Sequence, residues 1–362
     1  MSNRYTVILA GGRGERFWPH SRLHRPKHLL PIVGDTPLLQ QTIDRLGDTV
    51  PLENVYVLTN RDQRKSVLEI CPQLSSQQVI GEPVGRDTTA ATALATLLIK
   101  NRDSDGIFAM LASDHIIHDI AQFQADLNVA FETAESEKAL VTIGIKPTNP
   151  ATGYGYIQKG KVEKEIAGKK IYQVTRFVEK PNHETAEAYL KSGEYYWNAS
   201  MFVWQVHAIT DALVAHRPQL WDIFEGIDRR LAHGDDLDPL LDEYYPKIEK
   251  ISIDYAVMEK AERVLTIESA FDWDDVGEWP AIERHYEADE HGNIAHGTMI
   301  AQDASGNIVF NTDDRLTALI GVKDIIIAQT PDATLVCHKS QAQDIKKLVQ
   351  KISENPDWKH LI

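Results

Sequence analysis

The chain has 362 residues, which at about 150 residues per domain corresponds to two domains or one large one. Its composition, with 43% apolar and 25% charged residues, excludes whole-chain disorder, collagen-like repeats and disulfide scaffolds. The formal net charge of −15 argues against general nucleic-acid binding, because a phosphate backbone calls for a basic surface. A small anionic substrate in a local basic pocket is still compatible with that charge.

Cysteine use and hydropathy both predict a cytoplasmic protein. Cys71 and Cys337 stand in no metal-ligand spacing and are interpreted as reduced thiols. No apolar run approaches the ~18 residues of a membrane helix. The N-terminus shows no signal-peptide pattern, because its apolar run is short and glycines follow at once. We therefore expect neither a membrane nor a nucleic acid as partner.

Apolar bursts alternate with helical periods over the first part of the chain. The bursts predict buried strands at 5–9, 55–59, 78–80, 107–111 and 139–145. Helices are predicted from Pro37 with Thr36 as N-cap, at 61–70 with Asn60 as N-cap, at 88–100 and at 121–135. This alternation predicts a mostly parallel sheet with helices on both faces.

The pattern changes after Pro147, where several glycines interrupt the chain. A longer strand is predicted at 172–179 and helices at 183–192, 208–216 and 220–231. We interpret this middle part as an insertion that builds a second wall over the sheet.

Short apolar bursts then recur at roughly nine-residue spacing, which predicts a small β-coil or sandwich. They lie at 298–301, 307–310, 316–320, 325–327 and 334–337. Ile345, Leu348, Val349 and Ile352 stand at helical spacing and predict a closing amphipathic helix. Two domains are expected, 1–290 and 291–362.

The strongest chemical signal follows the first predicted strand, in a turn that contains Gly11, Gly12, Arg13, Gly14 and Arg16. Backbone N–H groups of such a turn can surround a phosphate, and arginines add bidentate charge. The spacing matches neither the dinucleotide fingerprint nor the Walker loop, and a glycine-rich turn is often only a tight turn. Lys27, which follows Pro26 on the same loop, favours anion binding.

Together, Gly11-Gly12-x-Gly14-x-Arg16 and Pro26-Lys27 resemble the signature of the sugar-1-phosphate nucleotidylyltransferases. Later motifs are similar to those of one group in that family, the mannose-1-phosphate guanylyltransferases (GDP-mannose pyrophosphorylases). These motifs are Glu82-Pro83-x-Gly85-Arg86, Ser113-Asp114-His115, 152–157, 177–181, Trp197-Asn198, 252–260 and 273–277. The length resembles the short form of the family, without an appended phosphomannose isomerase domain.

The resemblance implies a Rossmann-like α/β domain, with a mixed, mostly parallel sheet flanked by helices, and a small β-helix-like C-terminal domain. It implies an enzyme that makes GDP-mannose and pyrophosphate from GTP and mannose 1-phosphate by Mg²⁺-dependent in-line attack on the α-phosphorus. Arg16 and Lys27 are the implied catalytic residues. The implied nucleotide-binding residues are Leu9, Gly11, Gly12, Arg13, Gly14, Glu82, Gly85 and Ser113. A homodimer is also expected.

Asp114 and Asp275 are the implied ligands of Mg²⁺. Asp114 follows the fourth predicted strand, at the edge where open α/β sheets bind ligands. Converging carboxylates require a cation, and Mg²⁺ prefers one or two carboxylates plus phosphate oxygens. For Asp275 the alternative of a solvated loop acid stays open, because Asp272 and Asp274 lie beside it.

The implied sugar-phosphate residues are Gly153, Glu179, Lys180, Asn198 and Asp254. Neighbours on a regular strand point to opposite faces, so a shared role for Glu179 and Lys180 requires a twist or bulge. The alternatives are a surface ion pair for these two residues and a turn-stabilising role for Asn198.

Three positions depart from the family pattern, since His28 stands for a usual Gln, Asp87 for a usual Asn and Ser200 for a common Gly. The first two are placed on the nucleotide side. Ser200 either narrows the sugar pocket or occupies an accessible backbone conformation, which leaves the sugar open. The alternatives are therefore transfer from GTP, dTTP or UTP to another hexose or heptose 1-phosphate, and a catalytically silent subunit that senses GDP-mannose.

Overall fold

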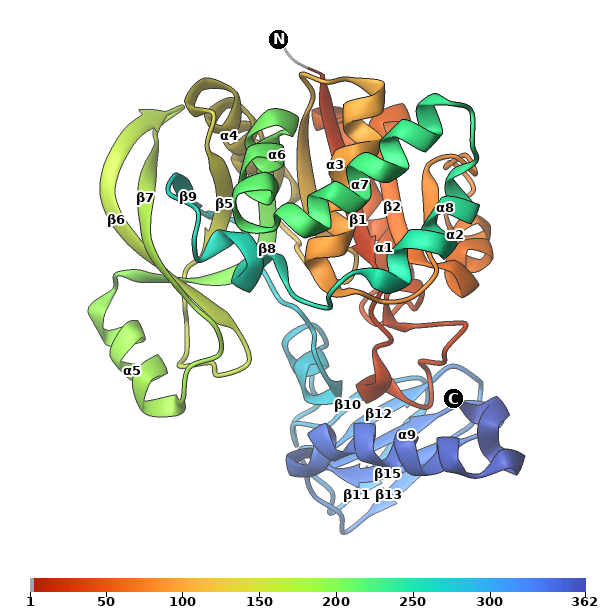
Figure 1. The fold of residues 1–362 in the computed structure, drawn as a ribbon. Coiled ribbons are helices and arrows are strands. Elements are labelled where there is room, and N and C mark those ends of the chain that lie inside the picture. The colour runs from red at the N-terminus through yellow and green to blue at the C-terminus, as the bar shows by residue number, and fades with distance from the viewer. Residues whose placement is uncertain (1–2) are drawn as a thin grey trace.

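A computed structural model describes residues 3–362, and a nine-stranded sheet organises the first part of the chain (Figure 1). Its strands are β1 (Arg4–Ala10), β2 (Val55–Asn60), β3 (Val79–Glu82), β4 (Ile107–Ala112), β5 (Leu140–Ile145), β6 (Gly155–Ile166), β7 (Lys169–Val178), β8 (Tyr195–Gln205) and β9 (Val264–Glu268). They lie in the order β3-β2-β1-β4-β8-β5-β9-β7-β6. The pairs from β3 to β4 and the pair β5–β9 are parallel, whereas β7 and β8 run against their neighbours.

The strands in the middle of the chain extend this sheet, whereas most of the helices there lie over one of its faces, so the predicted second wall is confirmed for these helices alone. β8 lies between β4 and β5, and β9, β7 and β6 continue the sheet beyond β5. The sequence does not reveal β8 because nearly all of its residues are buried, which removes the alternation of a half-exposed strand. Gly155 lies in β6 and not in a turn. The Glu179 carboxylate packs directly against it, and a Cβ at this position would overlap that carboxylate.

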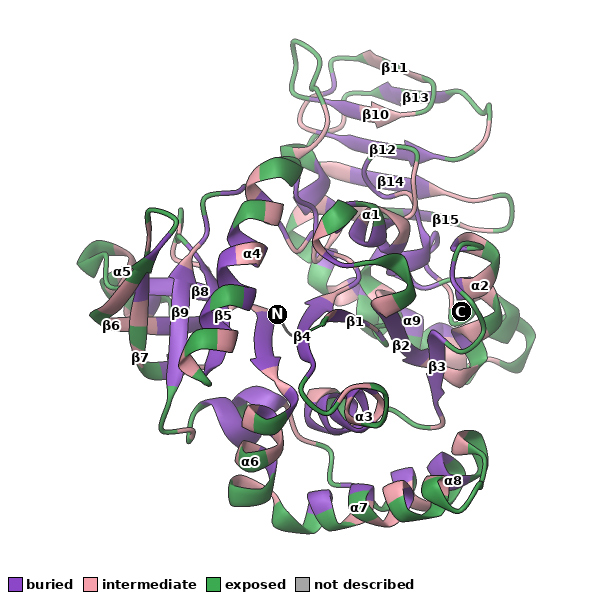
Figure 2. Ribbon diagram, turned by 90° about the horizontal axis from the view of Figure 1, so that it is seen from above, coloured by how far each residue is buried: buried purple, intermediate pink, exposed green. Residues whose placement is uncertain are grey.

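Helices pack on both faces of the sheet, as predicted. One apolar core includes α1 (Leu38–Asp44), α2 (Arg64–Ile70) and α4 (Ile120–Glu137). The other includes α3 (Asp87–Arg102), α6 (Val206–His216), α7 (Pro218–Ala232) and α8 (Leu237–Tyr244), while α5 (His183–Ser192) contacts β8. α3 is buried along most of its length and contacts α6 and α7 (Figure 2). Over residues 3–362, no helix has the length and apolar character needed to cross a membrane.

Of the two predicted N-caps, Thr36 is wrong, whereas Asn60 occupies the N-cap position of the 3-10 turn that leads into α2 but makes no side-chain cap hydrogen bond. α1 has Pro37 at its N-cap position, so Thr36 lies one residue outside. Asn60 precedes a short 3-10 turn, Arg61–Gln63, and its side-chain amide donates a hydrogen bond to the Gly11 carbonyl at 3.0 Å. Asn60 therefore supports the glycine-rich loop that follows β1.

The last part of the chain forms the predicted β-coil. Its strands are β10 (Ile294–His296), β11 (Met299–Gln302), β12 (Ile308–Asn311), β13 (Thr317–Ile320), β14 (Ile325–Gln329) and β15 (Thr334–His338). β10, β12 and β14 pair in parallel, as do β11 and β13, while β15 pairs antiparallel with β14. At successive turns, the Asn293 and Asn307 side chains bond to each other and to neighbouring carbonyls. α9 (Ile345–Glu354) follows, as its helical spacing predicted.

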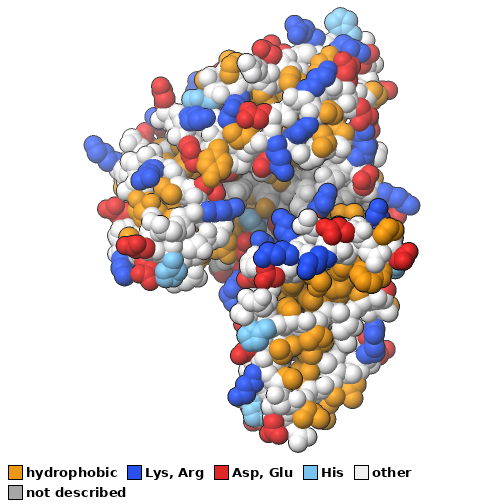
Figure 3. Space-filling model, turned by 60° about the horizontal axis from the view of Figure 1, so that its bottom comes forward, with side chains coloured by type: hydrophobic (Ala, Val, Ile, Leu, Met, Phe, Trp, Pro, Cys, Tyr) orange, Lys and Arg blue, Asp and Glu red, His pale blue; other side chains and the backbone are white. Residues whose placement is uncertain are grey.

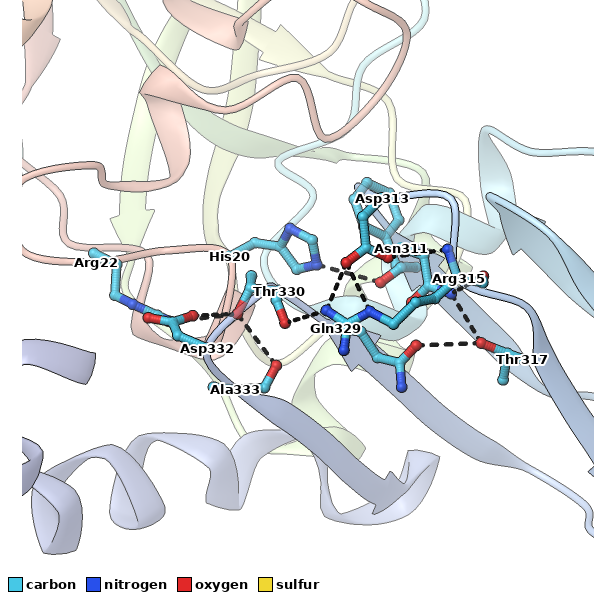
Figure 4. A network of polar contacts seen from close by, with 11 residues as sticks. His20, Arg22, Asn311, Asp313, Arg315, Thr317, Gln329, Thr330, Asp332 and Ala333 are labelled. Carbon is cyan, nitrogen blue, oxygen red and sulfur yellow. Dashed lines mark hydrogen bonds and ion pairs between the residues drawn. The ribbon is translucent and has the colours of Figure 1, made fainter.

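The C-terminal domain is docked on the segment that follows β1. Apolar side chains of both parts share one core, in which the rings of Trp279 and Phe310 lie 5.0 Å apart. Beside this core, Arg22 pairs with Asp332 at 3.0 Å, and a ring nitrogen of His20 lies 3.2 Å from the Phe310 carbonyl (Figure 4). The β-coil and the segment after β1 are therefore held together by apolar packing and by polar contacts.

Candidate functional site

Three hollows lie at the carboxyl ends of the parallel strands, where open α/β sheets bind ligands. A small cavity lies against the loops after β1 and β3 and the start of α3. A large cavity is lined by the loop before β6, the end of β7, part of β8 and the segment 250–255. A basic groove follows the glycine-rich loop and reaches α9. Figure 3 shows this face hollowed, with Lys and Arg side chains around the hollow.

The glycine-rich loop is shaped around Lys27. Gly14 has a φ of +62°, in the left-handed region that favours glycine. A Cβ at Gly14 would also overlap the Cβ of Lys27. Gly14 thus permits both the turn and the close approach of the lysine, which explains why a glycine is needed there.

Two arginines of the same loop line the basic groove. Arg13 Nη1 lies 3.7 Å from the carboxylate of Glu15, and Arg16 Nη1 lies 3.5 Å from the Gly277 carbonyl. Arg13 is mostly exposed, so its charge is available to a ligand in the groove. The groove is therefore suited to an anion.

Lys27 joins two acidic loops that are far apart in the sequence. Its side chain is buried, and Nζ donates to Asp114 Oδ2 at 2.9 Å, to the Asp114 carbonyl at 3.2 Å and to the Asp275 carbonyl at 2.5 Å. Enclosure in the cleft opposes ionisation, but the Lys27 ammonium, with His115 beside it, lowers the pKa of Asp114 to about 2. Asp114 is therefore a carboxylate throughout the physiological pH range.

The three carboxylates of the acidic cluster before the C-terminal domain, Asp272, Asp274 and Asp275, have different partners. Asp272 accepts hydrogen bonds from backbone N–H groups just before α4, and Asp274 is buried in an ion pair with Arg284. Asp275 lines the large cavity, and its Oδ1 accepts a hydrogen bond from the Tyr154 hydroxyl at 2.7 Å. Asp275 is therefore the member of the cluster that faces the site.

The residues present fit a Mg²⁺ ion that is shared with phosphate oxygens. Within residues 3–362, Asp114 Oδ1 and Asp275 Oδ2 accept no hydrogen bond. The same part of the chain holds no group of three His, Cys, Asp or Glu side chains that could bind a metal by itself. Two carboxylates that leave positions for phosphate oxygens are the donor set that Mg²⁺ prefers.

A carboxyl group, Glu82 at the end of β3, closes the small cavity. Four other residues from the predicted nucleotide set line this cavity: Leu9, Gly11, Gly12 and Gly85. Glu82 is buried and accepts a hydrogen bond from the Tyr245 hydroxyl. Burial raises the pKa of Glu82 to about 7, although the hydrogen bond from Tyr245 acts in the opposite direction.

Asp87 and Thr88 line both the small and the large cavity. Asp87 has a φ of +67°, a conformation that Asn and Asp tolerate better than most residues. The exchange of a usual Asn for Asp87 therefore keeps the same backbone. Thr88 Oγ1 accepts a hydrogen bond from the Ile253 N–H at 2.8 Å, which ties α3 to the opposite wall.

Glu179 and Lys180 line the same cavity because the chain kinks after β7. Lys180 has a φ of +45°, which breaks the alternation of the strand and supplies the predicted twist. Burial, together with the nearby Asp254 carboxylate, raises the pKa of Glu179. Gly153 lines the cavity as well, so the predicted sugar-phosphate residues lie around one space.

Asn198 and Asp254 form a buried pair in the wall of the large cavity. Asn198 lies in β8 and not in a turn, and its Nδ2 donates to Asp254 Oδ1 at 2.6 Å. The Asn198 Oδ1 accepts the backbone N–H of Ser200 at 3.0 Å, and burial raises the pKa of Asp254. Ser200 has a φ of +52° and also lines the cavity, which explains why glycine is common there.

Two residues predicted for the nucleotide side, Ser113 and His28, are buried and line none of the three hollows. Ser113 is buried beneath the loop, where its N–H donates to the Leu9 carbonyl at 3.1 Å, and it lines none of the three hollows. His28 is buried behind Lys27, and burial lowers the pKa of His28 to about 4. Neither side chain is placed to contact a ligand.

Residues of the site that escaped prediction include Tyr154, Gly155 and Lys346. Tyr154 and Gly155 lie in the motif 152–157, so that motif carried a signal for both. Lys346 lines the basic groove from α9 and belongs to no motif, so only the fold brings it to the site.

Comparisons with known proteins agree with this geometry. Residues 5–292 match the family described as nucleotidyl transferase, and residues 297–352 match the MannoseP isomerase/GMP-like beta-helix domain. A mannose-1-phosphate guanylyltransferase of Klebsiella pneumoniae is 40% identical over 351 residues, which cover 96% of this chain and 74% of that protein. One of Escherichia coli strain K12 is 38% identical, over 100% of this chain and 76% of that protein.

Solved structures give the same result. A crystal structure from Thermus thermophilus, described as a "mannose-1-phosphate geranyltransferase", matches with a TM-score of 0.84 and 35% identity. The match covers 97% of this chain and 99% of that chain. The resemblance inferred from the motifs is thereby confirmed: the chain belongs to the nucleotidyl transferase family and, within it, to the mannose-1-phosphate guanylyltransferases.

Proposed function

We propose that this protein makes GDP-mannose and pyrophosphate from GTP and mannose 1-phosphate. The observation that carries the proposal is Lys27, which holds Asp114 and the Asp275 loop together at the site. The main obstacle to a reaction between two polyanions is the repulsion between their phosphates. Such a reaction therefore needs a site with a fixed positive charge and carboxylates that can hold a cation. The named activity of the relatives supports the choice of substrates.

Guanine suits the small cavity because of Glu82. One carboxylate oxygen has two lone pairs and can accept hydrogen bonds from both N1–H and the 2-amino group of guanine, whereas adenine presents an acceptor at N1. Glu82 Oε1 is occupied by the Tyr245 hydroxyl, and Oε2 lies toward Gly11, which lines the same cavity. We therefore assign Glu82 to the base and the Gly11–Gly14 loop to the triphosphate.

Binding of GTP should strengthen as pH rises through 7. Because burial raises the pKa of Glu82 to about 7, the carboxylate that accepts the guanine N–H groups is the minor form below this pH. The KM for GTP is expected to be about tenfold higher at pH 6 than at pH 8. In Glu82→Gln, this tenfold change in the KM for GTP should vanish. GTP itself titrates in the same way in both experiments, so the difference between the two pH profiles reports on Glu82. Identical profiles would contradict the assignment.

The sugar phosphate suits the large cavity. Glu179 and Asn198 offer oxygen and amide groups to sugar hydroxyls, and Lys180 offers an ammonium to the phosphate. The pair between Asn198 and Asp254 fixes the amide orientation, so that its position does not depend on the substrate. We therefore assign this wall to mannose 1-phosphate.

The reaction then consists of one displacement at the α-phosphorus. A phosphate oxygen of mannose 1-phosphate forms the new P–O bond, the bond to the β-phosphate oxygen breaks, and its electron pair leaves with pyrophosphate. No general base is required, because the sugar phosphate is already ionised near pH 7. Lys27 offsets charge at the α-phosphate, Lys180 orients the nucleophile, and Arg13 and Arg16 hold the leaving pyrophosphate.

Asp114 and Asp275 are the residues proposed to hold Mg²⁺. The ion, when bound, neutralises phosphate charge between the two substrates. Asp114 stays ionised for this role because the Lys27 ammonium offsets its enclosure in the cleft. Tyr154 keeps one Asp275 oxygen in place and leaves the other available.

A direct assay tests the proposal. The purified protein with GTP, mannose 1-phosphate and Mg²⁺ should form GDP-mannose and pyrophosphate in equal amounts, as measured by anion-exchange chromatography. Omission of mannose 1-phosphate should stop the loss of GTP. Absence of product under these conditions would reject the proposal and leave the silent sensor of GDP-mannose, for which binding without turnover is the expected result.

We also propose a homodimer formed through the C-terminal domain. Ile300, Leu316 and Ile320 are more than half exposed, and β11 and β13, which carry two of them, are paired neighbours. Hydrophobic side chains gather on this domain (Figure 3), and exposed apolar patches of this kind mark interaction surfaces. Light scattering should give twice the chain mass, and Ile320→Glu should shift the protein toward monomer. A monomeric wild-type protein would contradict this proposal.

A further inference from the structure

The basic groove is completed by a side chain from the other domain. Arg13, Gly14, Glu15 and Arg16 line it from the loop after β1, whereas Lys346 comes from α9, more than three hundred residues later. The C-terminal domain carries no other residue of the three hollows. Lys346 is therefore the residue of this domain that lies in a hollow assigned to the substrates.

Packing fixes the position of this lysine. Ile345 and Val349 of α9 are buried in the core that also contains Phe17, and α9 contacts the short helix Glu15–Phe17 directly. Trp18 Nε1 donates to the Leu361 carbonyl at 2.7 Å, so the chain after α9 is tied to the same segment. The helix cannot shift along the groove without disrupting this core.

The charges of the groove are not balanced by protein groups. Three cations, Arg13, Arg16 and Lys346, share the groove with a single carboxylate, Glu15, which already lies 3.7 Å from Arg13. Within residues 3–362, Lys346 makes no ion pair, whereas the adjacent Lys347 pairs with Asp344 at 2.6 Å. Like charges held together in this way favour a polyanionic ligand.

We propose that Lys346 binds the β- and γ-phosphates of the nucleotide and the pyrophosphate product, so that the C-terminal domain is a working part of the active site. The inference rests on the proposed function, which places the triphosphate along the glycine-rich loop. Lys346 lies in the groove next to Arg13 and Arg16 and away from the large cavity assigned to the sugar. Its loss should therefore affect the nucleotide and pyrophosphate and not the sugar phosphate.

Three variants separate this role from a structural one. Lys346→Gln should raise the KM for GTP, and the KM for pyrophosphate in the reverse reaction, by about tenfold, the effect of one charge-assisted contact. The KM for mannose 1-phosphate should stay unchanged. Lys346→Arg should restore most of the loss. Lys347→Gln removes the same charge from the adjacent position and should behave as wild type.

Calorimetric titration with inorganic pyrophosphate and Mg²⁺ measures the affinity for pyrophosphate without turnover, so it tests the inference independently of the proposed function. Weaker binding of pyrophosphate by Lys346→Gln supports the inference even if the wild-type protein does not turn over GTP, a result that would reject the proposed function alone. Equal pyrophosphate affinity in wild type, Lys346→Gln and Lys347→Gln would overturn the inference, as would a similar rise in the KM for mannose 1-phosphate.

Discussion

Replacement of Asp114 by Asn should reduce kcat by at least about two to three orders of magnitude, as expected for loss of a group that acts on developing phosphate charge. The side chain keeps its size but loses the charge that pairs with Lys27 at 2.9 Å and that is proposed to bind Mg²⁺. The variant should also need more Mg²⁺ for its residual rate. Measurement of kcat across a Mg²⁺ titration tests both expectations.

Asp272→Asn is the matched control for this experiment. Asp272 accepts hydrogen bonds from backbone N–H groups before α4 and lines none of the three hollows, so its variant should keep wild-type turnover. Circular dichroism and thermal unfolding of both variants separate lost chemistry from lost fold. A rate within a few fold of wild type for Asp114→Asn would refute the assignment of Asp114 to the metal.

Substitution of Lys27 should be as harmful, and arginine should not replace it. Lys27→Gln removes the ammonium that donates to Asp114 and to the Asp275 carbonyl, so kcat should fall by about two orders of magnitude or more. Lys27→Arg keeps the charge, but a planar guanidinium is larger than the ammonium and does not fit the buried position in which Nζ donates to three oxygens. Steady-state rates of both variants check this expectation.

Lys65→Gln gives the matched control for Lys27. Lys65 is exposed and, among residues 3–362, pairs only with Glu69 one helical turn away, so its loss should leave rate and stability nearly unchanged. Lys27→Gln should also unfold at lower temperature, since Asp114 is left without its partner. Wild-type turnover by Lys27→Arg would show that charge alone suffices and would contradict the packing argument.

The first half of the sheet could be predicted from the sequence because its strands are short apolar bursts between helical segments. β8 could not, because a strand buried on both faces loses the alternation that identifies it. The error had a larger consequence: without β8 and β9, the middle of the chain was predicted only to cover the sheet and not to widen it.

Motif positions predicted most residues of the candidate site, whereas most of the backbone conformations and the long-range packing could not be predicted from the sequence. Asp87 and Ser200 have positive φ, which no composition or spacing reveals, whereas the twist at Lys180 followed from the role that Glu179 and Lys180 were expected to share. Asp274 and Asp275 have different roles because Arg284 pairs with the buried Asp274 carboxylate. Only the fold brings Arg284 to that carboxylate. Long-range packing likewise explains why a residue such as Lys346 carries no sequence signal.

A competition experiment tests the proposed function most directly. The wild-type protein is given equal amounts of GTP, dTTP and UTP together with equal amounts of mannose 1-phosphate and glucose 1-phosphate, in the presence of Mg²⁺. Mass spectrometry then identifies the sugar nucleotides that form. The guanine-binding role of Glu82 and the assignment of the large cavity to mannose 1-phosphate predict GDP-mannose as the main product. A mixture dominated by dTDP-glucose or UDP-glucose would contradict both assignments.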